Sequence, residues 1–259
     1  MNKFDAVIFD WAGTTVDYGS FAPVQAFMEV FKAYGVEPTS EEVRKPMGML
    51  KIDHIRTMLA MPRIAQCWEE VHGKAPTEED AQALYAIFEE KLMQILDQFA
   101  DPKPDTLNAV QQLREMGVAI GSTTGYNDMM MSIVVPAAKA AGYDPDAWFS
   151  PDATGKKGRP YPYMIFRNME ALGISDVRRV LKVGDTISDI KEGKAAGVVT
   201  AGVVVGSSQR GLSREEFEAL SPEEQKKHCE DVEKAFYDAG ADVVFQTLEE
   251  IPAFIKAEK

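Results

Sequence analysis

The chain has 259 residues, and its 28 Lys and Arg against 41 Asp and Glu give a formal net charge of −13. Hydrophobic residues make up 45% of the chain, which supplies enough apolar material for a core and excludes disorder as the main state. The acidic excess argues against a nucleic-acid-binding protein, whose binding face would be basic. A small anionic ligand remains compatible with it, because a local pocket can oppose the charge of the whole surface.

The cysteines and the apolar stretches indicate in which cellular compartment the protein is expected. Cys67 and Cys229 are far apart and form no CxxC pair, so they predict neither a disulfide framework nor a zinc site. The first ten residues contain Asp5 and Asp10 and lack the apolar core of a signal peptide. The most apolar later stretch, residues 195–206, is too short to span a bilayer. We therefore expect a cytoplasmic protein without membrane contact.

Short apolar runs separated by helical patterns predict an open parallel β-sheet with helices on both faces. The first run, residues 6–9, lacks the alternation of a half-exposed strand and indicates a strand buried on both sides. Later runs occupy residues 118–122, 180–183, 198–205 and 243–245. Between them, residues 105–116 carry apolar side chains at helical spacing and precede Gly117, a typical helix C-cap residue. The Lys- and Glu-rich residues 213–234 indicate a solvated helical surface.

Capping patterns mark further helices. Thr247 and Glu250 have the spacing of a capping box before a final helix. Residues 20–100 contain no run typical of a strand, and Thr39 with Glu42 again has capping-box spacing. Within the same stretch, Pro76-Thr77 opens a long helix that should run through Leu96 and present one apolar face.

Two stretches mark the limits of this helical region. Gly19 precedes it and the Pro-containing residues 101–104 follow it, and both are natural boundary positions. We therefore predict two domains, a discontinuous α/β core of residues 1–18 and 100–259 and an all-helical cap domain of residues 19–99. In such a core, ligands bind at the carboxyl ends of the parallel strands.

Four polar stretches follow predicted strands or lie between them: residues 10–17, 121–126, 156–162 and 183–189. Asp10 is followed by Gly and Thr residues, whose backbone N–H groups and hydroxyls can approach an anion. The hydroxyl-rich residues 121–126 suit phosphate oxygens, and Asp185 with Asp189 can hold a hard cation such as Mg²⁺. Each stretch alone could equally be a turn, a surface loop or a helix cap.

Together and in this order, the four stretches resemble the signature of the haloacid dehalogenase superfamily. That signature is an apolar strand ending in DxxGT, a strand-terminal Thr or Ser, a basic residue before Pro, and GDxxxD. The resemblance implies a Rossmann-like parallel-sheet core with an inserted helical cap. It further implies that Asp10 is the nucleophile and forms a covalent aspartyl intermediate. Thr124, Gly125 and Arg159 would then bind the transferring group.

The resemblance also implies a metal cofactor. Family members use Mg²⁺, which the carboxylates of Asp10 and Asp185 and the backbone carbonyl of Ala12 would hold. Asp189 would stand nearby as a ligand or as support. Residue 12 departs from the phosphatases of the superfamily, which carry a second Asp there to protonate the leaving alkoxide. Because Ala12 has no titratable group, a simple phosphate-ester hydrolase is disfavoured.

One lysine of the predicted cap offers another way to activate a leaving group. Lys51 follows the stretch Pro46-Met47-Gly48-Met49-Leu50, and desolvation among apolar side chains would lower its pKa. A neutral lysine can condense with an aldehyde to form a Schiff base. His54, three residues later, could share its helix face. Taken alone, Lys51 could equally be a solvated helix lysine and His54 a structural histidine.

With these residues, the chain resembles the phosphonatase branch of the superfamily, whose members hydrolyse the P–C bond of phosphonoacetaldehyde. The matching stretches are residues 9–19, 44–48 with 51–54, 121–126, 158–162 and 182–186. The resemblance implies that Lys51 forms a Schiff base with the aldehyde, and that Asp10 attacks phosphorus so that acetaldehyde and phosphate are released. It implies support around the amine and the leaving group from Met47, His54 and Tyr126. Ser20 stands where some relatives have Cys, which argues against a thiol role at that position but not against the core chemistry.

Two alternatives keep the same fold. A 2-haloacid dehalogenase-like hydrolase also lacks the second Asp, but it needs neither Mg²⁺ nor a cap lysine. A non-catalytic module that binds a phospho-ligand would not need Asp10, Lys51 and Asp185 together. The expected partners are a small-molecule phosphonate and a second copy of the chain, since family members are often homodimers through cap helices. We also expect the cap to close over the core, because Lys51 and Asp10 lie on different domains.

Overall fold

The computed structural model describes residues 3–209 and 211–258. Its β-strands are β1 (Ala6–Phe9), β2 (Ala119–Thr123), β3 (Ala147–Phe149), β4 (Val180–Gly184), β5 (Val199–Val203) and β6 (Val243–Phe245). Its α-helices are α1 (Phe21–Ala33), α2 (Ser40–Arg44), α3 (Lys51–Leu59), α4 (Pro62–His72), α5 (Glu78–Met93), α6 (Thr106–Glu115), α7 (Asp128–Ala140), α8 (Tyr163–Ala171), α9 (Ile187–Ala196), α10 (Arg214–Ala219), α11 (Pro222–Asp238) and α12 (Glu250–Ala257). Short 3₁₀ helices are η1 (Leu96–Phe99), η2 (Pro151–Thr154) and η3 (Val177–Arg179). No helix among these described residues is long and apolar enough to cross a membrane.

The strands form one parallel sheet in the order β3-β2-β1-β4-β5-β6, so the predicted α/β core with a parallel sheet is confirmed. Central strand β1 aligns Phe9 with Ser122 of β2 and with Val183 of β4. The strand order reverses direction between β1 and β4, which makes their carboxyl ends a topological switch point. Whatever follows these strands in sequence therefore meets at one edge of the sheet.

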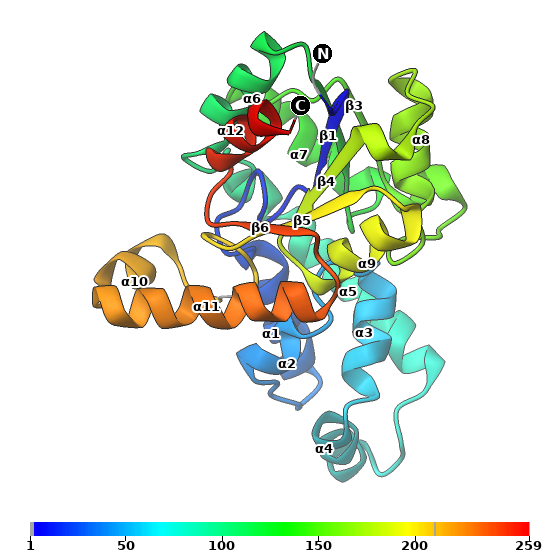
Figure 1. Ribbon diagram of the computed structural model, residues 1–259. Coiled ribbons are helices and arrows are strands. Elements are labelled where there is room, and N and C mark those ends of the chain that lie inside the picture. The colour runs from blue at the N-terminus through cyan, green and yellow to red at the C-terminus, as the bar shows by residue number, and fades with distance from the viewer. Residues whose placement is uncertain (1–2, 210, 259) are drawn as a thin grey trace.

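Both faces of the sheet are covered, as the uninterrupted apolar strands require. Side chains alternate along β1, so Val7 and Phe9 join the main apolar cluster while Ile8 enters a second one. The main cluster includes residues of α6, α7 and α12, and the second cluster includes residues of α8 and α9. Figure 1 shows α6 and α12 on one side of the strands and α8 and α9 on the other.

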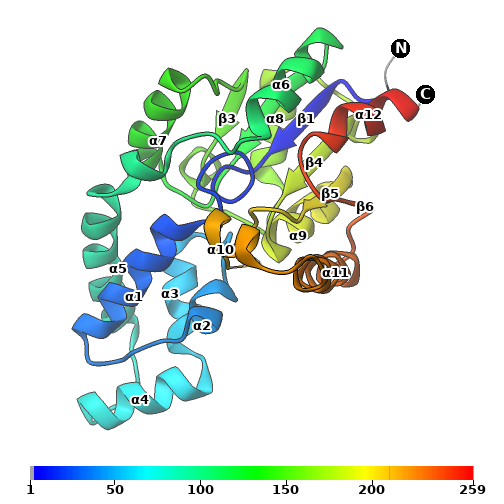
Figure 2. The same ribbon diagram turned by 90° about the vertical axis from the view of Figure 1, so that its left-hand side faces the viewer.

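Between β1 and α6, the described residues 21–99 form only helices, which we call the helical segment. Figures 1 and 2 show it beyond the edge of the sheet where β1 ends, away from the two chain termini. Aromatic stacking holds its interior, with ring centroids of Phe27 and Phe88 4.1 Å apart. The capping box predicted at Thr39 and Glu42 is confirmed. The domain limits themselves remain a prediction.

Some predicted elements differ from the structure. The helix that begins after Thr77 ends at Met93 rather than Leu96, and the 3₁₀ turn η1 follows. The capping box predicted at Thr247 and Glu250 is wrong, because α12 begins at Glu250 without a side-chain cap. The neighbouring backbone is fixed from a distance instead, since the N–H of Leu248 donates to the Asp105 carboxylate over 2.8 Å.

Two further differences lie at the periphery. Strand β3, three half-buried residues at the edge of the sheet, was not predicted from the sequence. Residues 213–234 do form the expected solvated surface, as α10 and most of α11. Only Val232 and Phe236 of α11 are buried, and Figure 1 shows α10 and the start of α11 projecting away from the sheet.

Candidate active site

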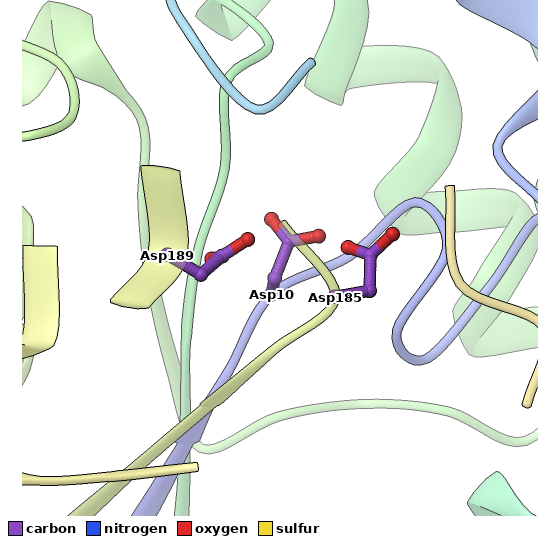
Figure 3. A group of neighbouring side chains, drawn as sticks. All are labelled: Asp10, Asp185 and Asp189. Atoms are coloured by element: carbon purple, nitrogen blue, oxygen red, sulfur yellow. The ribbon is translucent and has the colours of Figure 1, made fainter. Parts of the chain in front are cut away.

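Three buried aspartates meet at the switch point of the sheet. Asp10 directly follows β1, Asp185 follows β4, and Asp189 lies in the first turn of α9. One carboxylate oxygen from each lies within 4.8 Å of the others. Figure 3 shows the Asp10 carboxylate between the other two. Oxygen clusters of this kind suit a hard divalent cation.

The partners of Asp185 leave it available to a cation. Its Oδ2 accepts the backbone N–H of Ser208 over 2.7 Å, and its Oδ1 accepts the hydroxyl of Thr14 over 3.1 Å. The turn after Asp10 comes this close only because residue 13 is glycine. A Cβ at Gly13 would lie 2.2 Å from Asp185 Oδ2, and its φ of +90° also favours glycine. Both partners are neutral donors, and Asp185 forms no ion pair among the described residues, although the charge of the buried Lys103 opposes the rise in its pKa that burial causes.

Asp189, in contrast, is engaged by cations of the protein. Its Oδ1 lies 2.8 Å from Lys182 Nζ and 3.1 Å from Arg159 Nη2. Its Oδ2 completes a capping box with Thr186, whose hydroxyl donates to it over 2.6 Å. Of the two roles left open for Asp189 by the sequence, this geometry favours support over metal ligation.

Arg159 is the centre of the buried ionic network. Its Nη2 donates to Asp10 Oδ1 over 2.6 Å and to the hydroxyl of Thr123 over 2.8 Å, while its Nε donates to Glu192 over 2.9 Å. Lys182 donates to the same hydroxyl over 2.9 Å. Hydrogen bonds to Glu192 and Thr123 thus fix the Arg159 side chain, with its charge directed at the Asp10 carboxylate.

Lys182, Glu192 and Thr123 received no role from the sequence. A lysine inside the otherwise apolar run of β4 was a usable signal for Lys182, because a fully buried lysine needs a partner. Glu192 gave no such signal, since an acidic residue in a helix is usually exposed. Only the packing of α9 against the sheet reveals that this side chain is buried beside Arg159.

The charges of this network fit a divalent cation. Four buried carboxylates, Asp10, Asp185, Asp189 and Glu192, share the site with the two cations Arg159 and Lys182. These six groups alone sum to a net charge of −2, and the buried amines of Lys51 and Lys103 add positive charge nearby when protonated. Burial raises the pKa of Asp10, and the Asp189 and Asp185 carboxylates raise it further against the opposing effect of Arg159. A divalent cation would relieve this repulsion and keep Asp10 ionised.

Lys51 reaches the site from the helical segment. It is the first residue of α3, only 4% exposed, with its Nζ 5.1 Å from the ring centroid of Tyr126 and 5.8 Å from that of Phe27. Burial lowers the pKa of Lys51 to about 8, although the Asp10 carboxylate opposes the shift. The structure therefore shows the desolvated lysine that the sequence suggested.

His54 lies three residues after Lys51 in α3 and is neutral. It stacks on Phe27 with ring centroids 3.9 Å apart, and its Nε2 donates to the carbonyl of Val43 over 2.8 Å. Burial and the nearby Lys51 charge hold the pKa of His54 well below its usual value. A neutral imidazole adds no charge that would compete with the amine.

One small cavity joins the two sets of residues. It is lined by Asp10, Ala12, Ser20, Met47, Gly48, Lys51, Thr124, Gly125, Tyr126, Arg159 and Thr186. Every predicted site residue is in this lining except His54, Asp185 and Asp189, which lie behind it. The cavity holds about 20 Å³, slightly more than the ~10–15 Å³ that one water needs. The helical segment is therefore closed over the core in this structure.

The helical segment is in direct contact with the core at this cavity. A Cβ at Gly48 would lie 2.3 Å from the Thr186 hydroxyl, and the φ of +83° at Gly48 disfavours any other residue.

Across the cavity, the hydroxyl of Thr124 accepts the N–H of Tyr126 over 3.0 Å, which orients its own hydrogen for another acceptor. The cavity thus combines a carboxylate, a guanidinium, hydroxyl and amide donors, and a low-pKa amine.

Comparisons with known proteins agree with this arrangement. Residues 4–197 match the family model described as haloacid dehalogenase-like hydrolase. The chain is 54% identical over 253 residues to a phosphonoacetaldehyde hydrolase of Lysinibacillus sphaericus, covering 98% of this chain and 94% of that protein. It is 50% identical to a bifunctional phosphonoacetaldehyde hydrolase/aminoethylphosphonate transaminase of Clostridioides difficile, covering 96% of this chain and 39% of that longer protein. The crystal structure of a phosphonoacetaldehyde hydrolase-like protein from Oleispira antarctica superposes with a TM-score of 0.94 at 39% identity, covering 98% of this chain and 92% of that one.

Proposed function

The chain belongs to the phosphonoacetaldehyde hydrolases of the haloacid dehalogenase-like family, and we propose that it hydrolyses the P–C bond of phosphonoacetaldehyde to acetaldehyde and phosphate. The observation that carries this proposal is the placement of Lys51 and Asp10 in one cavity, the amine buried and the carboxylate bound by Arg159. The first forms an imine with an aldehyde, and the second attacks the neighbouring phosphorus.

Imine formation comes first. The neutral amine of Lys51 adds to the aldehyde carbon, and uptake of one proton from solvent with loss of water gives a protonated imine that carries the positive charge next to the P–CH₂ carbon. This step matters because direct cleavage of the P–C bond would expel a carbanion. With the imine in place, the electron pair of the broken bond moves into a C=C bond, and the leaving group departs as a neutral enamine.

Phosphoryl transfer follows within the same cavity. An oxygen of Asp10 forms a bond to phosphorus while the P–C bond breaks, which gives an aspartyl phosphate and the enamine on Lys51. Arg159 and the donors of Thr124 and Gly125 would orient the phosphoryl oxygens and offset their charge. Water then hydrolyses the acyl phosphate and releases phosphate. The enamine gains a proton on carbon and is hydrolysed to acetaldehyde, which restores the lysine.

Ala12 is consistent with this reaction. An enamine leaves without needing a proton at the moment of departure, so no second acid beside Asp10 is required. A 2-haloacid dehalogenase would also tolerate Ala12, but it would not require a buried amine aimed at the cavity. A binding module without catalysis would not require an amine whose pKa is lowered to about 8.

The donor set fits Mg²⁺. The carboxylates of Asp10 and Asp185 and the backbone carbonyl of Ala12 would hold it, and the cluster of buried carboxylate oxygens supports a divalent ion. When bound, the cation supplies positive charge for the phosphoryl oxygens and the nucleophile. Asp189 would act indirectly, by holding Lys182 and Arg159 in place.

The remaining cavity residues exclude water and shape the space. Met47 and the ring of Tyr126 close the cavity around the amine, and Ser20 presents a hydroxyl rather than a thiol. Because the closed cavity has room for about one water, the helical segment must move away for substrate to enter. Assembly into a homodimer stays a prediction from the family resemblance.

The test compares substrates and traps the intermediate. Release of acetaldehyde and phosphate is assayed with phosphonoacetaldehyde, with a haloacetate and with a phosphate ester. Borohydride added with phosphonoacetaldehyde should inactivate the enzyme and leave a reduced adduct on Lys51, located by mass spectrometry of peptides. A Lys51→Arg variant should lose both the adduct and turnover, whereas Lys45→Arg, changed at an exposed position, should keep both. An active enzyme without an adduct, or with an adduct on another lysine, contradicts the mechanism.

A further inference from the structure

Arg44 is a buried cation that the mechanism above does not use. It is the last residue of α2 and only 8% exposed. Its Nη1 donates to the carbonyl of Gly19 over 2.7 Å and to that of Ser208 over 3.1 Å. Its guanidinium carbon lies 5.0 Å from the centroid of the Phe21 ring. The side chain thus joins the helical segment to the turn that follows β5.

The surroundings of this guanidinium are unusual for a group that serves stability alone. Buried arginines are normally paired with carboxylates, because desolvating an unpaired charge is costly. Among the described residues, no carboxylate forms an ion pair with Arg44, and its buried Nε has no hydrogen-bond partner. The carboxylates of Asp17, Asp185 and Glu216 act on its charge only from beyond ion-pair distance. Its only hydrogen bonds go to two backbone carbonyls, so what the side chain holds in place is the backbone at Gly19 and Ser208.

One carbonyl that Arg44 holds, that of Ser208, belongs to a turn that is bonded to the candidate metal site, and the other, that of Gly19, belongs to a segment hydrogen-bonded to this turn. The N–H of Ser208 donates to Asp185 Oδ2 over 2.7 Å. The N–H of Gly19 donates to the carbonyl of Gly206 over 2.7 Å. The backbone of Ser208 therefore forms two hydrogen bonds. Its carbonyl accepts one from Arg44 of the helical segment, and its N–H donates the other to Asp185.

We propose that Arg44 is a positioning residue that couples closure of the helical segment to cation binding at Asp185. The inference rests on the proposed function, which places the cation there. When the helical segment is closed, Arg44 fixes the backbone of Ser208, and the N–H of Ser208 fixes the orientation of the Asp185 carboxylate. When the segment opens, that support is withdrawn. By thermodynamic linkage, a cation at Asp185 must favour closure to the same degree.

The test measures cation binding without substrate. Mg²⁺ alone is titrated into the full chain by calorimetry, using wild type, Arg44→Met, Arg44→Lys and Lys45→Met. The last variant is the matched control, because it removes a positive charge from the adjacent, exposed residue. Arg44→Met keeps an apolar stem of similar length and should raise the Kd for Mg²⁺ by about 5- to 150-fold, the usual range of coupling between sites. Arg44→Lys, which keeps one donor, should fall between Arg44→Met and wild type, and Lys45→Met should match wild type.

A second readout separates positioning from a general loss of stability. In hydrogen exchange, Mg²⁺ should slow exchange of residues 40–49 in wild type and in Lys45→Met, but not in Arg44→Met. Equal Kd values and equal Mg²⁺-dependent protection in wild type and both Arg44 variants would overturn the coupling and leave the proposed function intact. Absence of Mg²⁺ binding in wild type would overturn the coupling together with the metal role. If Arg44→Met does not fold, Arg44→Lys decides by the same two comparisons.

Discussion

The burial of Lys51 makes the rate of imine formation depend on pH in a way that the structure quantifies. Only the neutral amine can attack the aldehyde, and burial lowers the pKa of Lys51 from 10.5 to about 8. At pH 7 an amine with a pKa of 8 is about 9% neutral, whereas one with a pKa of 10.5 is about 0.03% neutral. The fold therefore increases the reactive fraction at neutral pH about 300-fold.

The direction of this pH dependence follows from the protonation state of Lys51 that the folded protein disfavours. Burial penalises the ammonium, so the folded protein loses this proton at lower pH than the unfolded chain does. Raising the pH from 6 to 8 should therefore increase the reactive fraction about tenfold per unit at first and then less steeply, and above pH 8 the gain should level off. For the same reason, stability contributed by Lys51 should rise with pH between about 8 and 10.5, where only the unfolded chain holds the proton.

Two assays over pH 6 to 9 check this prediction. The first follows kcat/KM for acetaldehyde release, which reports groups of the free enzyme and free substrate. The second removes the ionisation of the substrate from the measurement and needs no reagent to enter the closed cavity: lysines are labelled with ¹³C at Cε, and the Cε shift of Lys51, assigned by its loss in Lys51→Arg, is followed by NMR. A midpoint near 8 is expected for Lys51. A Cε shift that is still that of the ammonium at pH 9, as for an amine with a midpoint near 10.5, would refute the reasoning.

Three other outcomes are expected. Asp10→Asn should abolish phosphate release and still allow borohydride to trap substrate on Lys51, since imine formation precedes attack on phosphorus; loss of trapping as well would place Asp10 earlier in the reaction. Asp185→Asn should lower kcat/KM by at least about 100-fold and remove calorimetric Mg²⁺ binding, because even indirect partners of metal ligands contribute about 10- to 100-fold; full activity in chelator would contradict the metal role. Phe88→Ala removes a fully buried ring stacked on Phe27 and should reduce the free energy of unfolding in urea by about 3–5 kcal/mol. A change below about 1 kcal/mol would show that the helical segment does not depend on this stack.

Much of this protein was predictable because the relevant information is local or follows chain order. The buried strand before Asp10 and the strand before Asp185 are legible as apolar runs, and parallel strands bring their carboxyl ends to one edge. The family assignment follows from the order of those strand ends, and the comparisons confirm it. The apolar neighbours of Lys51 likewise anticipated an amine removed from water.

The tertiary structure decided what depends on partners distant in sequence. Asp185 and Asp189 look equivalent in the motif GDxxxD, yet Asp189 faces the cations Lys182 and Arg159 while Asp185 faces neutral donors. Which carboxylate stays free for a metal is set by the packing of α9 against the sheet. The same is true of Thr247. Its spacing from Glu250 suggested a capping box, but the folded backbone places the start of α12 at Glu250, without a side-chain cap.

Residues 44 and 208 show the same division most clearly. Nothing in the sequence connects an arginine of a short helix with a serine 164 positions later, because hydrogen bonds between such residues exist only once both elements are packed. The sequence by itself determined the parallel α/β core, the family and the residues that gather at the strand ends, since periodicity and motif order are properties of the chain. The tertiary structure alone decided how those residues share charge and which contacts join the helical segment to them, since burial and partner choice are properties of the packed molecule.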